Sequence, residues 1–163
     1  MEKKYENMGK DLQWIKKLLF AGVFIQENRL HAVFDRNNDM SVKQWLLLAV
    51  CQAYDSPPDL SSLADTMGCS RQNVKKIALC LERDGYIELQ KSEKDGRALC
   101  VRRTEKGIKY AKDRAELGKQ IHDVIYQEFT DSDLEEYYKL SIKMMKGIDH
   151  LEEFFNNMGK DGD

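Results

Sequence analysis

Polar and basic side chains suited to reading DNA bases gather at the start of one predicted helix. They are Ser70, Arg71, Gln72, Asn73, Lys75 and Lys76. Glutamine and asparagine pair bidentately with adenine, arginine with guanine, and lysine with guanine or phosphate. Ser70 is a preferred N-cap, so the helix is expected to begin there and to expose the other side chains near its N-terminus. The chemistry that this pattern predicts is hydrogen bonding to base edges in the DNA major groove.

A charged hairpin is predicted directly after this helix. Gly85 ends the helix, and residues 86–91 and 98–103 alternate in a way typical of two antiparallel strands. The connection between them is polar and contains an Asp-Gly dipeptide, which is common in turns. The basic side chains of this hairpin are placed to reach the DNA backbone or the minor groove, and they are Lys91, Lys94 and Arg97.

The charge of the chain is unevenly distributed. The whole sequence carries a net charge of −2, but residues 71–103 hold nine Lys or Arg against five Asp or Glu. This segment therefore stands at +4 and the rest of the chain at −6. A basic patch on an acidic chain can attract DNA through its local field. Taken alone, the charge pattern would favour a merely solvated surface, so it supports DNA binding only together with the helix and hairpin.

Capped helices position the base-reading segment. Ser41 and Gln44 fit a capping box at the start of an apolar helix that ends before the prolines at 57 and 58. Asp59 is expected to cap a short helix over residues 60–67, which Gly68 closes in a left-handed conformation. The order of helix, turn, helix and hairpin indicates a winged helix-turn-helix.

Long apolar helices flank this lobe. Residues 10–34 repeat apolar side chains at helical spacing over a wide part of the circumference, and residues 131–155 carry a long apolar and aromatic stripe. Thr104 is expected to cap one further helix that reaches Gln127. A single subunit would expose these apolar surfaces, so we expect an obligate homodimer.

Four motifs resemble those of the multiple-antibiotic-resistance regulator (MarR) family of bacterial transcription factors. The family's Leu-Thr-x-x-Gln-aromatic helix start is similar to Met40-Ser41-x-x-Gln44-Trp45, and its helix-turn-helix to Leu63-Ala64 with Gly68-x-Ser70. Its Leu-Glu-x-x-Gly-Leu-Val segment is similar to Leu81-Glu82-x-x-Gly85-Tyr86-Ile87. Its wing signature is similar to Asp95-x-Arg97-Ala98-x-x-Val101-x-x-Thr104-x-x-Gly107. Two positions depart from the pattern, since Gly96 stands where the family often has an arginine and Arg103 replaces a usual leucine.

The resemblance implies a mainly α fold with a small β-hairpin wing, in which residues 1–163 form a single unit. The winged-helix lobe would span about 40–103, and the dimerisation helices about 10–34 and 104–157. The recognition helices of the two subunits would read successive major grooves of a pseudo-palindromic operator, as in a repressor, and Asp95 would belong to the structure of the wing.

The resemblance also implies regulation by a small molecule bound between the dimerisation helices and the DNA-binding lobe. Aromatic walls with two polar groups would suit an aromatic effector, and the candidates are Phe24, Asn28, His31 and Trp45. The alternative for these four side chains is ordinary packing in the core or on the surface.

Other classes of function find little support. The four cysteines and three histidines lack metal-ligand spacing, and no nucleophile–base pair or phosphate-binding loop is present, so we predict no metal, no cofactor and no enzyme activity. No apolar run reaches the ~20 residues that span a bilayer, and the N-terminus lacks signal-peptide features, so a cytoplasmic protein without membrane association is expected. The remaining alternative is a winged-helix protein-interaction module without DNA binding, which the cations at groove-facing positions disfavour.

Overall fold

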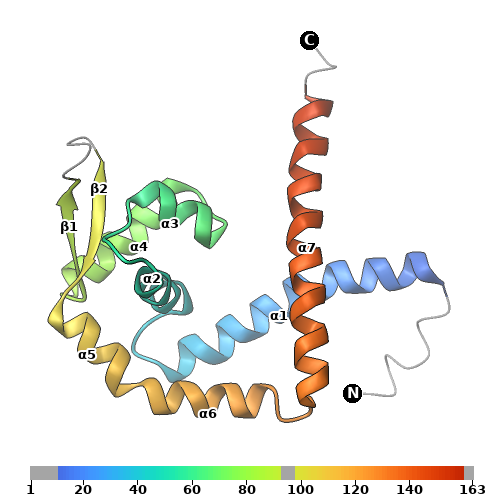
Figure 1. Cartoon of the computed structure of the whole chain (residues 1–163), viewed down its shortest axis with the longest axis horizontal. Coiled ribbons are helices and arrows are strands. Elements are labelled where there is room, and N and C mark those ends of the chain that lie inside the picture. Colours follow the sequence, from blue (N-terminus) through green and yellow to red (C-terminus); the bar gives the residue numbers. More distant parts are fainter. Residues whose placement is uncertain (1–10, 93–97, 160–163) are drawn as a thin grey trace. The chain divides into compact units, whose positions relative to one another are not determined.

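The computed structural model describes residues 11–92 and 98–159 and is mainly α-helical with one antiparallel hairpin, as predicted (Figure 1). Its helices and strands, in chain order, are α1 (Leu12–Asn37), α2 (Val42–Gln52), α3 (Leu60–Met67), α4 (Arg71–Arg83), β1 (Ile87–Lys91), β2 (Leu99–Arg103), α5 (Glu105–Asp113), α6 (Ala115–Ile125) and α7 (Asp131–Met158). The chain divides into two compact units at the boundary between Asp113 and Arg114. The first unit holds α1 to α5 with the hairpin, and the second holds α6 and α7.

The predicted caps set the helix boundaries of the lobe. The Ser41 hydroxyl accepts from the Gln44 N–H at 3.3 Å, while the Gln44 side chain accepts from the Ser41 N–H at 2.9 Å, which is the predicted capping box of α2. Asp59 caps α3, and α3 ends at Gly68, which has a φ of 62°. The left-handed conformation of Gly68 is one that residues with a Cβ rarely adopt, so a glycine is required at the turn between α3 and α4.

The hydrophobic core lies between α2, α3, α4 and the base of the hairpin. Its side chains come from all of these elements because each helix turns its apolar stripe inward. The core residues are Met40, Leu47, Leu48, Cys51, Leu60, Leu63, Ala64, Val74, Ile77, Ala78, Leu81, Ile87 and Val101. This packing fixes the orientation of α4, since four of its side chains are held in the core.

The hairpin is tied to the lobe at two places. β1 and β2 pair antiparallel in a register that runs from Ile87 opposite Arg103 to Lys91 opposite Leu99. The Val101 N–H donates to the Pro58 carbonyl at 2.8 Å, so the segment before α3 lies along the outer edge of β2. The Glu82 carboxylate accepts from the Leu89 N–H at 2.8 Å, which joins the end of α4 to β1. The base of the hairpin is therefore held at a fixed position beside α4.

The start of α5 packs closely against the end of α4. The Thr104 hydroxyl caps α5 by accepting from the Gly107 N–H at 3.1 Å, as predicted, and it donates to the Gly85 carbonyl at 2.7 Å. The Thr104 N–H donates to the Tyr86 carbonyl at 3.1 Å. A Cβ at Gly107 would lie 2.2 Å from that same carbonyl oxygen, so only glycine allows the approach.

The prediction of one helix from Thr104 to Gln127 is wrong. α5 ends at Asp113 and α6 begins at Ala115, because Arg114 leaves the helical conformation with φ −100° and ψ 3°. No proline or glycine stands at this point, so local propensity favours a continuous helix. The break coincides with the boundary between the two compact units.

The second unit consists of α6, α7 and an aromatic corner between them. α7 begins with a second capping box, in which Thr130 and Asp133 exchange hydrogen bonds. Phe129 contacts Tyr126 and Tyr137, with ring centroids 5.7 Å and 5.9 Å apart. Neither α6 nor α7 has a buried residue within the single chain.

Candidate nucleic-acid interface

The core packing of α4 leaves one continuous face of the helix exposed. Val74, Ile77, Ala78 and Leu81 are buried, so the opposite face points to solvent. The side chains on that face follow helical spacing and are Arg71, Gln72, Lys75, Lys76 and Leu79. Four of them are the predicted base-reading residues, whereas Leu79 was not predicted. Its position four residues after Lys75 and seven after Gln72 was the signal that could have identified it.

The N-terminus of α4 is ordered by side-chain hydrogen bonds. The Ser70 hydroxyl accepts from the Asn73 N–H at 3.2 Å, so Ser70 is the predicted N-cap and Asn73 is half-buried beside it. Hydrogen bonding from the Ser62 N–H is the main cause that lowers the pKa of Asp59, and the charge of nearby Arg71 adds to it. The cap of α3 and the first turn of α4 therefore lie close together, with the cation of Arg71 near a carboxylate.

The remaining polar side chains of this face have no partner in the part of the chain that the structure describes. Within the described residues, Gln72, Lys75 and Lys76 make no side-chain hydrogen bond or ion pair, and all three are exposed. An exposed lysine without a carboxylate partner keeps its full charge available to a polyanion. The exposed end of α4 therefore offers two unpaired cations and one amide to a ligand.

The basic residues of the hairpin are only partly described. Lys91 is exposed at the end of β1, opposite Leu99. Lys94, Asp95 and Arg97 lie outside the described residues, so their predicted contacts with DNA and their role in the wing stay predictions.

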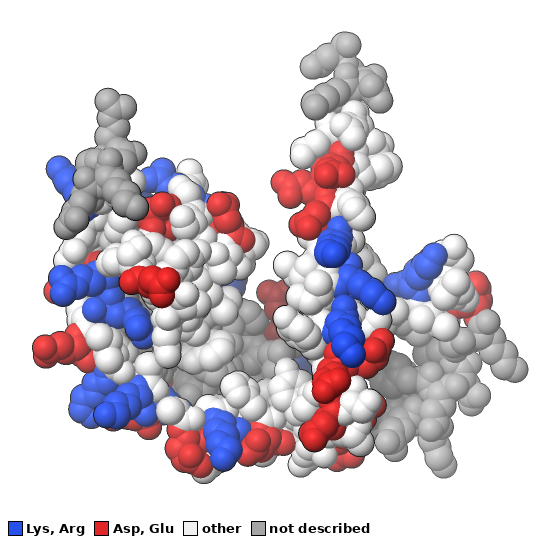
Figure 2. Space-filling model, viewed as in Figure 1, with Lys and Arg blue, Asp and Glu red and all other residues white. Residues whose placement is uncertain are grey.

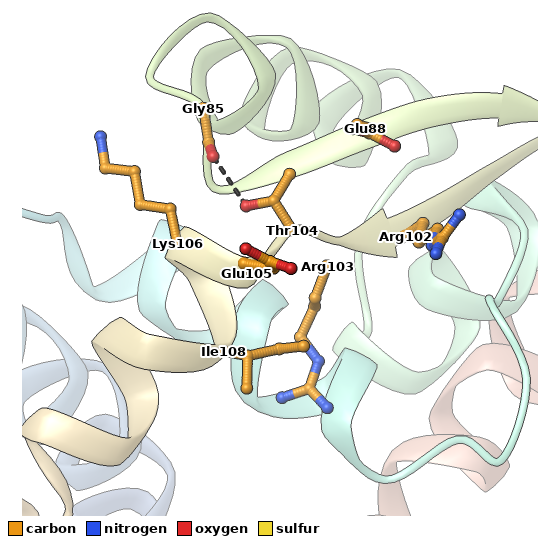
Figure 3. Close-up of a pocket in the computed structure, with 8 residues that line it drawn as sticks. All are labelled: Gly85, Glu88, Arg102, Arg103, Thr104, Glu105, Lys106 and Ile108. Atoms are coloured by element: carbon orange, nitrogen blue, oxygen red, sulfur yellow. Dashed lines mark hydrogen bonds between the residues drawn. The ribbon is translucent and has the colours of Figure 1, made fainter.

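Further basic side chains lie at the base of the hairpin, where Figure 2 shows blue side chains grouped on the edge of the lobe. An open pocket of about 480 Å³ lies there, between the hairpin and the start of α5 (Figure 3). Its lining mixes bases with acids and consists of Gly85, Glu88, Arg102, Arg103, Thr104, Glu105, Lys106 and Ile108.

The cations of this pocket are engaged within the protein or directed apart. Arg102 lies opposite Glu88 in the strand register, and Arg103 donates to the Gln52 side chain at 3.5 Å. Lys106 donates to the Asp84 carbonyl at 2.6 Å and lies 4.3 Å from the Tyr86 ring centroid. In Figure 3, Lys106 and Arg102 extend to opposite sides of the strand end. These contacts position the hairpin and do not form a site for one anion. Arg103, which stands where the MarR family usually has a leucine, thus links β2 to α2.

The four residues predicted to line an effector site lie on two helices. Phe24, Asn28 and His31 share one face of α1 at spacings of four and three residues, and Trp45 lies on α2. Trp45 is 40% exposed and contacts the Phe34 ring, with centroids 5.8 Å apart. Phe24 is 52% exposed, and none of the four lines the pocket of Figure 3. The structure leaves both aromatic rings accessible to solvent, and the effector role of the four residues stays a prediction.

Metal-ligand clusters and membrane-spanning helices are both absent from the described residues. No group of three or more His, Cys, Asp or Glu is arranged to hold a metal ion among them. None of the helices described combines the length and the apolar composition that are needed to cross a bilayer.

Comparison with known sequences gives one distant relative with a stated role. No protein-family profile matches the chain. The transcriptional repressor MprA of Escherichia coli K12 is 26% identical over 93 residues, which are 57% of this chain and 53% of MprA. The match therefore spans about half the length of that relative.

Comparison with solved structures gives matches over most of the chain. The MarR/EmrR family transcriptional regulator of Acinetobacter sp. ADP1 matches with a TM-score of 0.73 and 18% identity, over 83% of this chain and 98% of that one. FabT of Streptococcus pneumoniae, solved in complex with DNA, has a TM-score of 0.63 and 22% identity, over 86% of this chain and 99% of FabT. PcaV of Streptomyces coelicolor, a transcriptional regulator solved with its natural ligand, has a TM-score of 0.64 and 14% identity, over 86% of this chain and 95% of PcaV. The chain therefore has the winged-helix fold of the MarR-type transcriptional regulators, and its resemblance to that family is confirmed at the level of the fold.

Proposed function

We propose that this protein is a sequence-specific DNA-binding regulator of transcription, and that it represses its target genes as a homodimer. The observation that carries the proposal is the exposed face of α4, where two lysines and an amide have no partner among the described residues and the other face of the helix is fixed in the core. A helix held in this way can enter the major groove without losing its packing. The lysines then contact guanine or phosphate, while Gln72 and Asn73 read adenine.

The hairpin supplies the second part of the proposed interface. The base of β1 and β2 is anchored beside α4, so a wing that extends from it follows the helix onto the duplex. Lys91, Lys94 and Arg97 then bind a flanking phosphate or the minor groove, which adds affinity without reading the sequence. Asp95 holds the structure of the wing in this proposal. Such a protein works in the cytoplasm, where its DNA is.

The proposal of a homodimer rests on the long helices. α1 and α7 have no buried residue within the chain, although both carry large apolar side chains. Exposed surfaces of this extent mark association sites in soluble proteins. Pairing through residues of about 10–34 and 104–157 places two α4 helices on one duplex, about one helical turn of roughly 34 Å apart, which requires a pseudo-palindromic operator.

Regulation by a small aromatic molecule is the third part of the proposal. A structural neighbour that was solved with its natural ligand supports it. Phe24, Asn28, His31 and Trp45 form the proposed effector site. A bound effector changes the affinity for DNA only if it binds the DNA-competent state of the dimer and the other state with unequal affinity.

The experiment that tests DNA reading is selection of binding sites from a random duplex pool by the purified protein. Wild type is expected to enrich a pseudo-palindrome, and Gln72→Ala to lose the preference at one position of each half-site by about 1–3 kcal/mol. Lys143→Ala is the control, because Lys143 is an exposed lysine on α7 and does not belong to the helix-turn-helix. Selection that enriches no sequence would contradict the proposal and favour the protein-interaction module.

The oligomeric state has its own test. Light scattering of the purified chain is expected to give a mass near twice the 19.0 kDa subunit. A stable monomer at micromolar concentration would refute the proposed pairing of the long helices.

A further inference from the structure

Leu79 is an apolar side chain on the otherwise polar outer face of α4. It is 47% exposed, while its neighbours Val74, Ile77, Ala78 and Leu81 are buried. It lies on the exposed face of α4 together with Gln72, Lys75 and Lys76, which precede it by seven, four and three residues, respectively. A leucine in this position contributes little to the core, so its side chain is available to a partner that binds this face of α4.

The chemistry of the major groove leaves one partner for such a side chain. An isobutyl group makes no hydrogen bond and has no charge, so it gains nothing from phosphates or from the donors and acceptors of base edges. The thymine C5-methyl group is the apolar feature that the major groove presents, and apolar side chains recognise it by contact. The surrounding lysines supply the charge complementarity that brings this surface to DNA.

The spacing on α4 gives the distance between the bases that are read. An α-helix rises about 1.5 Å per residue, so Leu79 lies about 10.5 Å beyond Gln72 along the axis. Base pairs stack about 3.4 Å apart, so the two residues address bases separated by up to about three steps. Leu79 therefore adds a second, apolar reading position to each half-site.

We propose that Leu79 is a specificity-determining residue that selects thymine through contact with its C5-methyl group in the major groove. This inference rests on the proposed function, because it requires α4 to occupy the groove. The inference specifies thymine and its distance from the base that Gln72 reads, and the proposed function alone specifies neither.

The test uses the duplex that the wild-type protein selects, with each thymine replaced in turn by deoxyuridine, which lacks only the methyl group. Loss of one buried methyl corresponds to about fourfold in Kd, and loss in both half-sites to roughly 15-fold. Fluorescence anisotropy is expected to show this loss at one thymine of each half-site for wild type. Leu79→Ala is expected to bind the thymine and deoxyuridine duplexes equally.

Two variants separate this role from a structural one. Leu79→Met keeps an apolar side chain of similar length and is expected to retain the discrimination between thymine and deoxyuridine. Ile108→Ala truncates an apolar side chain that is 50% exposed on α5 and is expected to retain it fully. Thermal unfolding of Leu79→Ala is expected to match wild type, since the side chain is outside the core.

Each outcome decides the inference. If deoxyuridine weakens wild type and Leu79→Ala equally, or weakens neither, DNA is read but Leu79 does not select thymine. If wild type enriches no sequence, the proposed function fails and this inference fails with it.

Discussion

Replacement of Gly107 by alanine tests the packing that holds the hairpin against α5. Gly107 is buried at the third position of α5, and an added Cβ would lie 2.2 Å from the Tyr86 carbonyl oxygen and 3.2 Å from its carbon. A relaxed carbon–oxygen contact is about 3.3–3.6 Å, so the two backbones must separate by about 1 Å. The obstacle is backbone, and no change of rotamer relieves it.

The expected cost is the balance of three effects. Alanine favours the helix over glycine by about 0.8–1 kcal/mol. Overpacking of this kind costs about 1–3 kcal/mol. The displaced Tyr86 carbonyl also weakens its hydrogen bond from the Thr104 N–H, now 3.1 Å, which contributes about 1 kcal/mol. We expect Gly107→Ala to lower the free energy of unfolding by about 2 kcal/mol, or the Tm by about 4–8 °C for a chain of this size.

Thermal unfolding followed by circular dichroism measures this change, at one fixed subunit concentration because a dimer gains stability with concentration. Gly118→Ala is the matched control, since Gly118 is helical and its added Cβ meets no atom of the chain within 4 Å. The control is expected to unfold at or above the wild-type Tm. A Gly107→Ala protein as stable as wild type would refute the described contact between Tyr86 and α5.

Three further predictions concern the lobe. Asp59→Ala removes the cap that accepts from the N–H groups of Ser61 and Ser62, and is expected to lower the free energy of urea unfolding by about 1 kcal/mol at pH 7. Hydrogen bonding from the Ser62 N–H is the main cause of a pKa of Asp59 below its ordinary 3.8 in the folded protein. The stabilisation by this cap is therefore present above pH 3.8 and is lost as the pH falls through the pKa of the folded state. A difference in unfolding free energy between wild type and Asp59→Ala that stays unchanged down to pH 2 would contradict this prediction. Burial raises the pKa of the Cys51 thiol to about 11, so iodoacetamide at pH 8 is expected to alkylate the other three cysteines before Cys51. Mass spectrometry of the alkylated protein measures this order, and modification of Cys51 first would contradict its burial. Leu81→Ala truncates a fully buried side chain and is expected to cost about 2–5 kcal/mol in the same urea assay, whereas a loss below 1 kcal/mol would place Leu81 outside the core.

The local features of the lobe were predictable because their causes are local. The caps at Ser41, Asp59 and Ser70 act within three residues of themselves, and the structure shows each of their hydrogen bonds. The left-handed turn needs a glycine, which Gly68 supplies. The outward face of α4 followed from helical spacing alone once its start was known.

The features that were not predictable depend on contacts between distant segments. The pairing of the chain at Pro58 with Val101 joins positions far apart in the sequence, and no local pattern marks it. The break at Arg114 has no helix-breaking residue, so no local pattern marks it either. Leu79 is a different case: its spacing from Gln72 and Lys75 places it on the outward face, but it was missed because a leucine in an amphipathic helix is ordinarily assigned to the core.

The central claim is that the exposed face of α4 binds DNA, and the salt dependence of binding tests it most directly. Affinity for the selected duplex is measured by anisotropy between 50 and 200 mM salt, for wild type and for Lys75→Ala with Lys76→Ala. Each phosphate contact contributes about 0.9 to the slope of log K against log salt, so removal of both lysines from both subunits is expected to lower that slope by up to about 3.6. A slope that is the same for the two proteins would contradict the claim.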